Sequence, residues 1–227
     1  LIAKGDSTMT EVDRAMQAAL DVSRDVILIQ FNNEYKAKVN ESKEDRYKRF
    51  EHINLKVLES YAKKWPGVPL GLSDHTHGSM TVLGAVGLYD CCAVEKHFTF
   101  DNTKEGQDHA FSMTPESWQA MVDETRVLKQ ELQRVEKEDF QERLNVVERF
   151  VEDPEALRLA IGSGEKKLES NEVNTVIVQR RAVRATRMLK AGDVLSEADL
   201  FPLRPCPKGA VSPADINLLI GKRLTAN

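Results

Sequence analysis

The stretch Gly71-Leu-Ser-Asp-His-Thr-His77 decides the fold class. It continues a short apolar run from Val68 and ends in polar and ionisable side chains. Such a run, followed by a helix, indicates the carboxyl end of a buried parallel strand, where α/β sheets and barrels bind ligands. Side chains alternate along a strand, so His75 and His77 could share a face. The residues alone leave two interpretations open: a metal site, or a polar loop that happens to contain two histidines.

The same pattern of a short apolar run and a helix repeats outward from this stretch. Four such units are predicted, over Leu1–Arg24, Val26–Lys64, Val68–Leu88 and Cys91–Val135. Strict alternation of strands and helices is typical of parallel α/β structure. The sequence therefore predicts a parallel sheet of four strands, which is half the number found in an eight-fold barrel.

Polar residues also follow two other predicted strands. Asn32, Asn33 and Tyr35 come after the apolar run Val26–Ile29, and Glu95-Lys-His97 follows the run Cys91–Val94. Their side chains could face a ligand, although asparagines at such a point also shape turns. Residues 36–50 are rich in charge and lack apolar periodicity, so we expect them to form an exposed excursion.

The sequence pattern changes after residue 161. We expect a linker over residues 162–175 and a small α+β domain over residues 176–227, which leaves residues 1–161 to the first domain. The run Val176–Val183 is β-rich and predicts a strand. Arg204 lies between Pro202 and Pro205, which stiffen the backbone that presents its guanidinium.

Composition excludes several classes of protein. The 227 residues are 41% hydrophobic and 30% charged, which is ordinary for a globular chain. A net charge of −4 argues against a nucleic-acid-binding protein. No apolar run approaches the roughly 18 residues that span a bilayer. The three cysteines do not form a disulfide framework, so we expect a cytoplasmic protein.

Four motifs together resemble the sialic acid synthase family, whose members condense phosphoenolpyruvate with N-acetylmannosamine or a related aminosugar. The motifs are Gly71-Leu-Ser-Asp-His-Thr, Glu95-Lys-His-Phe-Thr99, Gly106-Gln-Asp-His-Ala110 and Leu203-Arg-Pro-Cys-Pro-Lys-Gly209. The resemblance implies an α/β fold: the second half (strands 5–8) of a TIM (β/α)8 barrel, followed by a small α+β SAF (antifreeze-like) domain. Laid on that family pattern, the chain would begin at the fifth barrel strand, so we expect it to be a fragment that lacks the first four barrel units.

The resemblance also implies roles for the polar strand ends. His75 and His97 match the two metal-binding histidines of the family. Ser73 and Asn33 match groups that hold phosphoenolpyruvate. Glu95 matches the acidic residue two positions before the second histidine, and is a candidate catalytic residue.

Tyr35 and Asp108 match groups near the aminosugar and complete the set of candidate catalytic residues. A loop-capping role remains the alternative for Asp108. His77 and His109 are interpreted as neighbours of the site that bind no metal. Arg204 matches an arginine that the SAF domain sends into the active site of a partner subunit, which implies a domain-swapped homodimer.

Departures from the family pattern leave the sugar open. Gln30 stands where some members have a histidine, and a glutamine at this position resembles legionaminate-type and related nonulosonate synthases. Gln107 replaces a proline. Lys36 stands where a proline is common. Residues 36–50 and 136–160 resemble insertions.

The implied function is a metal-dependent enzyme, a transferase that makes a nine-carbon, sialic-acid-type sugar. A divalent metal polarises the aldehyde of the sugar. Imidazole and oxygen ligands favour Mn²⁺, with Mg²⁺ or Zn²⁺ possible. Only Lys4 and Lys96 offer cations at the strand ends for the phosphate, so we expect the chain alone to be inactive. The alternatives are a non-catalytic module for sugar binding or assembly, and a metal aldolase that uses another keto-acid donor.

Overall fold

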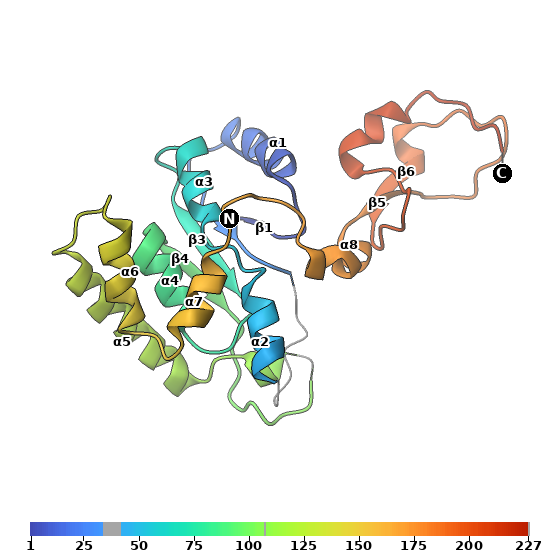
Figure 1. Ribbon diagram of the computed structural model, residues 1–227. Coiled ribbons are helices and arrows are strands. Elements are labelled where there is room, and N and C mark those ends of the chain that lie inside the picture. The colour runs from blue at the N-terminus through green and yellow to red at the C-terminus, as the bar shows by residue number, and fades with distance from the viewer. Residues whose placement is uncertain (34–41, 107, 227) are drawn as a thin grey trace. The chain divides into compact units, whose positions relative to one another are not determined.

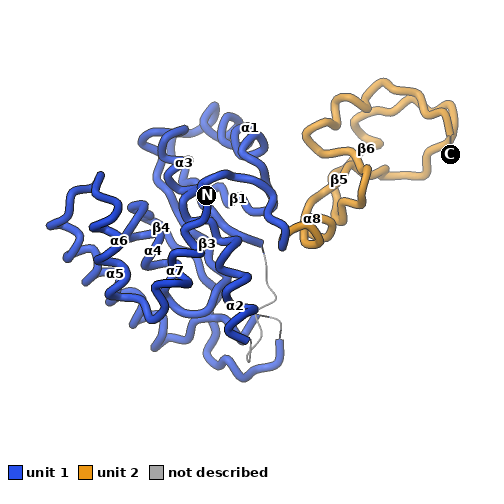
Figure 2. The backbone as a smooth tube through the Cα atoms, viewed as in Figure 1, with its two compact units in different colours: residues 1–171 blue, residues 172–227 orange. Residues whose placement is uncertain are grey.

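The computed structural model describes residues 1–33, 42–106 and 108–226. These form two compact units, Leu1–Asn171 and Glu172–Asn227, which Figure 2 shows in different colours. The division falls within the stretch 162–175 that the sequence predicts as a linker.

Unit 1 is built on a sheet of four parallel strands (Figure 1). Its strands are hydrogen-bonded in chain order: β1 (Ile2–Lys4), β2 (Leu28–Gln30), β3 (Leu70–Asp74) and β4 (Ala93–Lys96). The alternation in the sequence predicts this α/β class, and the structure confirms it. Because all four strands run in the same direction, their carboxyl ends meet at one edge of the sheet.

The helices of unit 1 begin where local signals place them. Thr8 and Glu11 form a reciprocal capping box at the start of α1, and Thr114 caps α5 with Pro115 at its first position. Each cap satisfies amide groups that have no partner within the helix. The helices are α1 (Met9–Leu20), α2 (Lys43–Phe50), α3 (Val57–Lys64), α4 (Met80–Tyr89), α5 (Pro115–Leu132), α6 (Phe140–Glu148) and α7 (Pro154–Ile161).

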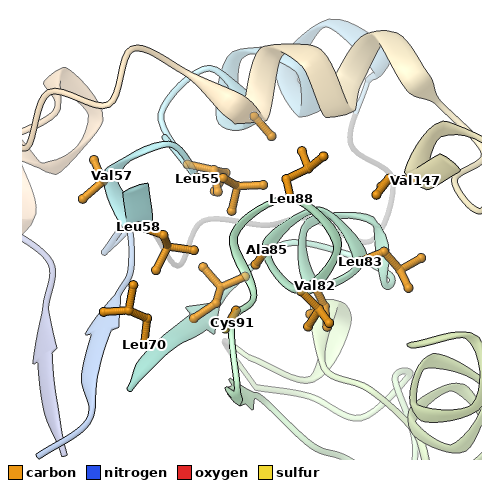
Figure 3. Close-up of a cluster of buried hydrophobic side chains, with 14 of the residues drawn as sticks. Leu55, Val57, Leu58, Leu70, Val82, Leu83, Ala85, Leu88, Cys91 and Val147 are labelled. Carbon is orange, nitrogen blue, oxygen red and sulfur yellow. The ribbon is translucent and has the colours of Figure 1, made fainter. Parts of the chain in front are cut away.

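Helix α4 is the centre of the hydrophobic core. Its sequence is apolar on every side, which is typical of a buried helix, and its residues from Thr81 to Leu88 are all buried. It contacts β3 as well as α3, α5, α6 and α7. Figure 3 shows side chains such as Leu55, Leu58 and Val147 packed around it. Burying one such side chain stabilises the fold by roughly 1.5–3 kcal/mol.

Two glycines let the other helices approach α4 closely. A methyl group on Gly84 would lie 2.7 Å from Leu157 Cδ1 and 2.9 Å from Leu55 Cδ1. A methyl group on Gly87 would overlap the side chain of Val147. The small residues therefore set the distance at which α6, α7 and the segment before α3 pack against α4.

Residues 36–50 are expected to form an exposed excursion; in the part that the structure describes, residues 42–45 and Lys48 are exposed, but the segment also contains a helix, α2. Ser42 caps α2 through the amide of Asp45, and Glu44 pairs with Lys48 one turn later. Acidic residues at the start of a helix and basic residues at its end stabilise it without an apolar stripe. Residues 34–41 lie outside the described residues.

Strand β4 begins later than predicted and includes Glu95 and Lys96. Asp90 adopts a left-handed conformation that ends α4, and Cys91 donates its amide hydrogen to the Ala85 carbonyl. Cys91 therefore belongs to the end of the helix rather than to the strand. Residues 139–160 form two helices, α6 and α7, because Asp153 and Pro154 start a new helix.

Residues 162–171 are fixed to unit 1 by hydrogen bonds. The Asn54 side chain accepts from the amide of Gly164 at 2.8 Å and donates to the Glu165 carbonyl at 3.0 Å. Ser60 donates to the Gly164 carbonyl at 2.7 Å. The stretch is therefore an ordered strap across the surface of unit 1, which we call the strap.

Unit 2 contains α8 (Val173–Gln179), β5 (Ala182–Ala185) and β6 (Leu200–Leu203). The two strands pair antiparallel. The prediction of a strand over Val176–Val183 is wrong for its first half, because the residues up to Gln179 are helical and only the end of the run enters β5. The described residues also contain short 3-10 helices. One lies in unit 1 at His109–Phe111, one at the boundary of the units at Ser170–Glu172, and two in unit 2 at Glu197–Asp199 and Pro213–Leu218.

The length of the helices and the state of the cysteines bear on the environment of the protein. No helix in the described part of the chain is both long and apolar enough to cross a membrane. The cysteines Cys91, Cys92 and Cys206 are all free thiols.

Candidate functional site

Two pairs of polar side chains join the ends of β3 and β4. Ser73 is the register partner of Glu95, and Asp74 is the register partner of Lys96. The Ser73 hydroxyl donates to the Glu95 carboxylate at 2.8 Å. Ser73 is buried whereas Glu95 is exposed, so the carboxylate is presented to solvent at this edge of the sheet.

The other pair is a buried ion pair. The Lys96 ammonium lies 2.5 Å from the Asp74 carboxylate and donates to the Thr76 carbonyl at 2.8 Å. The Asp74 side chain is fully buried and also accepts from the Thr81 hydroxyl at 2.6 Å. Burial alone would raise the pKa of Asp74, but the Lys96 ammonium and the hydrogen bonds together lower it below its ordinary value.

This pair corrects one expectation about phosphate binding. Lys96 was a candidate cation for the phosphate of phosphoenolpyruvate, but its charge is neutralised by Asp74 inside the unit. Its role is to hold the loop from Asp74 to Thr76 in place. Lys4, the other candidate cation, lies half-buried at the end of β1.

His75 and His97 lie side by side at the carboxyl ends of β3 and β4. Their ring centroids are 5.1 Å apart, with the rings nearly perpendicular. His75 is buried, and the side chain of His97 is 29% exposed. One imidazole is therefore fixed within the unit while the other meets solvent.

His75 is oriented by a backbone carbonyl and by aromatic rings. Its Nδ1 lies 3.0 Å from the carbonyl oxygen of Asn32. The rings of Phe31 and Phe111 meet it edge-on, at centroid distances of 5.8 and 6.4 Å. Burial lowers the pKa of His75, because the charged imidazolium is poorly solvated there.

The loop after β4 places further ionisable groups beside His97. The Asp108 carboxylate lies 3.7 Å from His97 Nδ1 and is about half exposed. His109 is bound at its Nδ1 by the Thr99 hydroxyl, at 2.7 Å. Asp108 can therefore orient His97 or contact a ligand, whereas His109 is engaged within the loop.

Asn33 occupies the end of β2 and is held by an acidic residue. Its side-chain amide donates to the Asp6 carboxylate, and both side chains are buried. Asp6 was not among the residues identified from the sequence. A signal was present, because Gly5-Asp6 follows the apolar start of β1 in the same way that polar residues follow the other strands.

Gln30 points away from the strand ends. Its side chain is buried, donating to the Ile53 carbonyl at 3.3 Å and accepting from the Tyr61 hydroxyl at 3.4 Å. Gln30 therefore belongs to the packing between β2 and α3 in this structure.

Of the other residues identified from the sequence, His77 belongs to unit 1 and Arg204 to unit 2. Tyr35 lies outside the described residues, as do Lys36 and Gln107. Arg204 follows β6 in unit 2 and is exposed. His77 lines a cavity of about 460 Å³ between α2, the start of α4 and the loop before α7, together with Lys43, Tyr47 and Asp153.

The donor set is compatible with an open metal site. Across residues 1–33, 42–106 and 108–226, no three His, Cys, Asp or Glu side chains form a group that could hold a metal ion. His75 and His97 supply two imidazoles, and Nδ1 of His75 faces a carbonyl. Catalytic metals commonly have three protein ligands and one open position, so these two imidazoles would supply part of such a ligand set.

Comparisons with known proteins show which family the chain resembles. The model of the NeuB family matches residues 1–137, and the model of the SAF domain matches residues 180–227. N,N'-diacetyllegionaminic acid synthase from Legionella pneumophila is 32% identical over 78% of this chain and 41% of its own length. The Campylobacter jejuni protein of the same name is 25% identical over the whole chain and 56% of its own length.

The fold has a counterpart among solved structures. The crystal structure of the spore coat polysaccharide biosynthesis protein SpsE from Bacillus subtilis superposes with a TM-score of 0.72 at 22% identity, covering 97% of this chain and 55% of that one. The chain thus spans about half the length of the curated relatives it matches. Because the family model matches more than half of the chain, the chain belongs to the NeuB family, and its last residues belong to a SAF domain.

Proposed function

We propose that this chain contributes the metal-binding part of the active site of a nonulosonate synthase. The enzyme would condense phosphoenolpyruvate with an N-acetylmannosamine-like aminosugar and release phosphate. The observation that carries this proposal is the adjacent pair His75 and His97, at the carboxyl ends of neighbouring parallel strands. Two relatives named N,N'-diacetyllegionaminic acid synthase support the class of reaction.

The reaction joins two carbons and breaks one bond to oxygen. Carbon 3 of phosphoenolpyruvate attacks the aldehyde carbon of the open-chain sugar, and the aldehyde oxygen takes up a proton. Water then adds to carbon 2, and phosphate leaves with the bridging oxygen. A divalent cation, Mn²⁺ or Mg²⁺, held by His75 and His97 would polarise the aldehyde oxygen.

The other residues at the strand ends would bind and orient the substrates. Ser73 and Asn33 would hold phosphoenolpyruvate by hydrogen bonds. Glu95 and Asp108, both at least partly exposed beside the histidines, would exchange protons with the sugar or with water. Tyr35 would contact the sugar.

Assembly and environment extend the proposal. Arg204 is exposed at the end of β6, and in a domain-swapped homodimer it would enter the partner's site as a cation for an anionic substrate. The free thiols Cys91, Cys92 and Cys206 are compatible with a reducing cytoplasm.

The decisive experiment separates binding from turnover. Purified chain is titrated with Mn²⁺ and with phosphoenolpyruvate by calorimetry, and phosphate release is measured after an aminosugar is added. We expect Mn²⁺ to bind and to strengthen the binding of phosphoenolpyruvate. We expect no turnover by the chain alone, because Asp74 neutralises the charge of Lys96.

The variants His75→Ala and His97→Ala should each abolish Mn²⁺ binding. His109→Ala is the matched control, because His109 is bound by Thr99 in the same loop and should leave Mn²⁺ binding unchanged. Equal Mn²⁺ affinity in all three variants would remove the proposal. Binding of the sugar without any dependence on metal would favour the non-catalytic module instead.

A further inference from the structure

The strap ends in a side chain that contacts the strand end beside the histidine pair. Asn171 is the last residue of unit 1, and its side chain pairs with that of Asn32. Asn32 donates to Asn171 Oδ1 at 3.1 Å, and Asn171 donates back to Asn32 Oδ1 at 2.8 Å. A reciprocal amide pair fixes both the position and the rotation of the two side chains, because each supplies one donor and one acceptor.

Asn32 needs this support because it lies beyond the ladder of β2. The strand ends at Gln30, so the sheet pairing does not extend to Asn32. Asn32 is buried and Asn171 is half-buried, so the pair is partly protected from water. The adjacent Asn33 is held separately by Asp6. Asn171 therefore holds the side chain of Asn32, whereas Asp6 holds that of the neighbouring Asn33.

The backbone of Asn32 in turn determines the state of His75. A carbonyl oxygen can only accept a hydrogen bond, so its 3.0 Å contact with Nδ1 requires the proton to be on Nδ1. Nε2 of the neutral ring then carries the lone pair that a metal needs. Ligating histidines commonly donate their other ring nitrogen to a carbonyl or a carboxylate, and this outer contact tunes metal affinity.

We infer that Asn171 is a positioning residue, which fixes the tautomer and the orientation of His75 through Asn32. The inference rests on the proposed metal role of His75. It also makes the strap, which leads directly into Glu172 and unit 2, part of the machinery that prepares the site. A displacement of the strap would release the Asn32 carbonyl and leave the imidazole free to exchange tautomers.

The test reads the tautomer directly. The two ring nitrogens of His75 are observed by ¹⁵N NMR in metal-free protein, at a pH where the imidazole is neutral, and Mn²⁺ affinity is measured in parallel. In the parent protein we expect the proton on Nδ1. In Asn171→Ala we expect a mixture of tautomers and about 10-fold weaker Mn²⁺ binding. Asn171→Asp, which retains the acceptor and loses the donor, should fall between the two.

The matched control is Ser60→Ala, which removes another hydrogen bond to the strap, at Gly164, on a part of the chain that does not lead to His75. It should leave the tautomer and the affinity unchanged. Adding Asn32→Ala to Asn171→Ala should weaken Mn²⁺ binding no further, since both remove one contact.

The outcomes distinguish this inference from the proposed function. An unchanged tautomer in Asn171→Ala, or an equal change in Ser60→Ala, overturns the positioning role even if the metal binds. If the parent protein binds no Mn²⁺ but Asn171→Ala still shifts the tautomer, the effect of Asn171 on His75 through Asn32 is supported and the proposed metal site is overturned.

Discussion

Replacing Lys96 with methionine should destabilise unit 1 strongly. The side chains of Lys96 and Asp74 are 1% and 0% exposed, so the remaining carboxylate would be charged, buried and without its cation. Removing one partner of a buried ion pair costs about 3–5 kcal/mol. Two threonines, Thr76 and Thr81, still donate to the carboxylate and place the expected loss near the lower end of that range.

The same substitution should reverse the response to pH. In the parent protein the pKa of Asp74 lies below its unfolded value of about 3.9, so its contribution to stability is present above that pH and is lost only as pH falls through the folded pKa. Without Lys96, burial should raise the folded pKa above the unfolded value. The variant should then be relatively more stable at low pH and lose stability as the pH rises from about 4 toward 7.

Urea unfolding followed by tryptophan fluorescence measures this in unit 1 alone, because the two tryptophans of the chain, Trp65 and Trp118, both belong to that unit. Lys48→Met is the control, since it breaks an exposed ion pair with Glu44 and should change the free energy of unfolding very little. If Lys96→Met costs no more than this control and keeps the parent's pH response, the buried pair does not stabilise the unit as described.

Three further predictions concern packing. Gly84→Ala should lower the free energy of unfolding by about 1–2 kcal/mol, because overpacking against Leu157 and Leu55 exceeds the gain in helix propensity; greater stability in urea would contradict it. Leu157→Ala should cost about 2–5 kcal/mol alone, and less than the sum when combined with Gly84→Ala, as measured by a double-mutant cycle. Gly5→Ala should weaken Mn²⁺ binding several-fold, because its methyl group would lie 2.6 Å from the Phe31 ring that packs edge-on against the site; unchanged affinity by calorimetry would refute the role of that ring.

The fold of unit 1 could be predicted because its signals are local. Apolar runs, the caps at Thr8 and Thr114, and the order of strands and helices all appear in the sequence. Helix α2 was missed because it is stabilised by charges and a serine cap rather than by an apolar stripe. The run from Val176 was predicted as a strand because β-branched residues favour strands, yet its first residues form α8, so tertiary context overrode propensity.

The candidate site could be predicted only in part. Polar residues after each strand indicated where it lies, but the pairing of His75 with His97 instead of His77 depended on the resemblance to a family. The sequence could not show that Lys96 is buried or that Asn171 reaches Asn32, since both contacts join residues distant in the chain. Whether a lysine faces solvent or a carboxylate depends on packing, which no local pattern records.

The two polar pairs between β3 and β4 also favour the observed register of these strands. Ser73 opposes Glu95 and Asp74 opposes Lys96 in the observed pairing. A slip by one residue in one direction would place Asp74 opposite Glu95, setting two carboxylates against each other, and would turn every side chain of the strand to the other face. That misaligned pairing is thus penalised electrostatically, whereas the observed alignment places the imidazoles of His75 and His97 together.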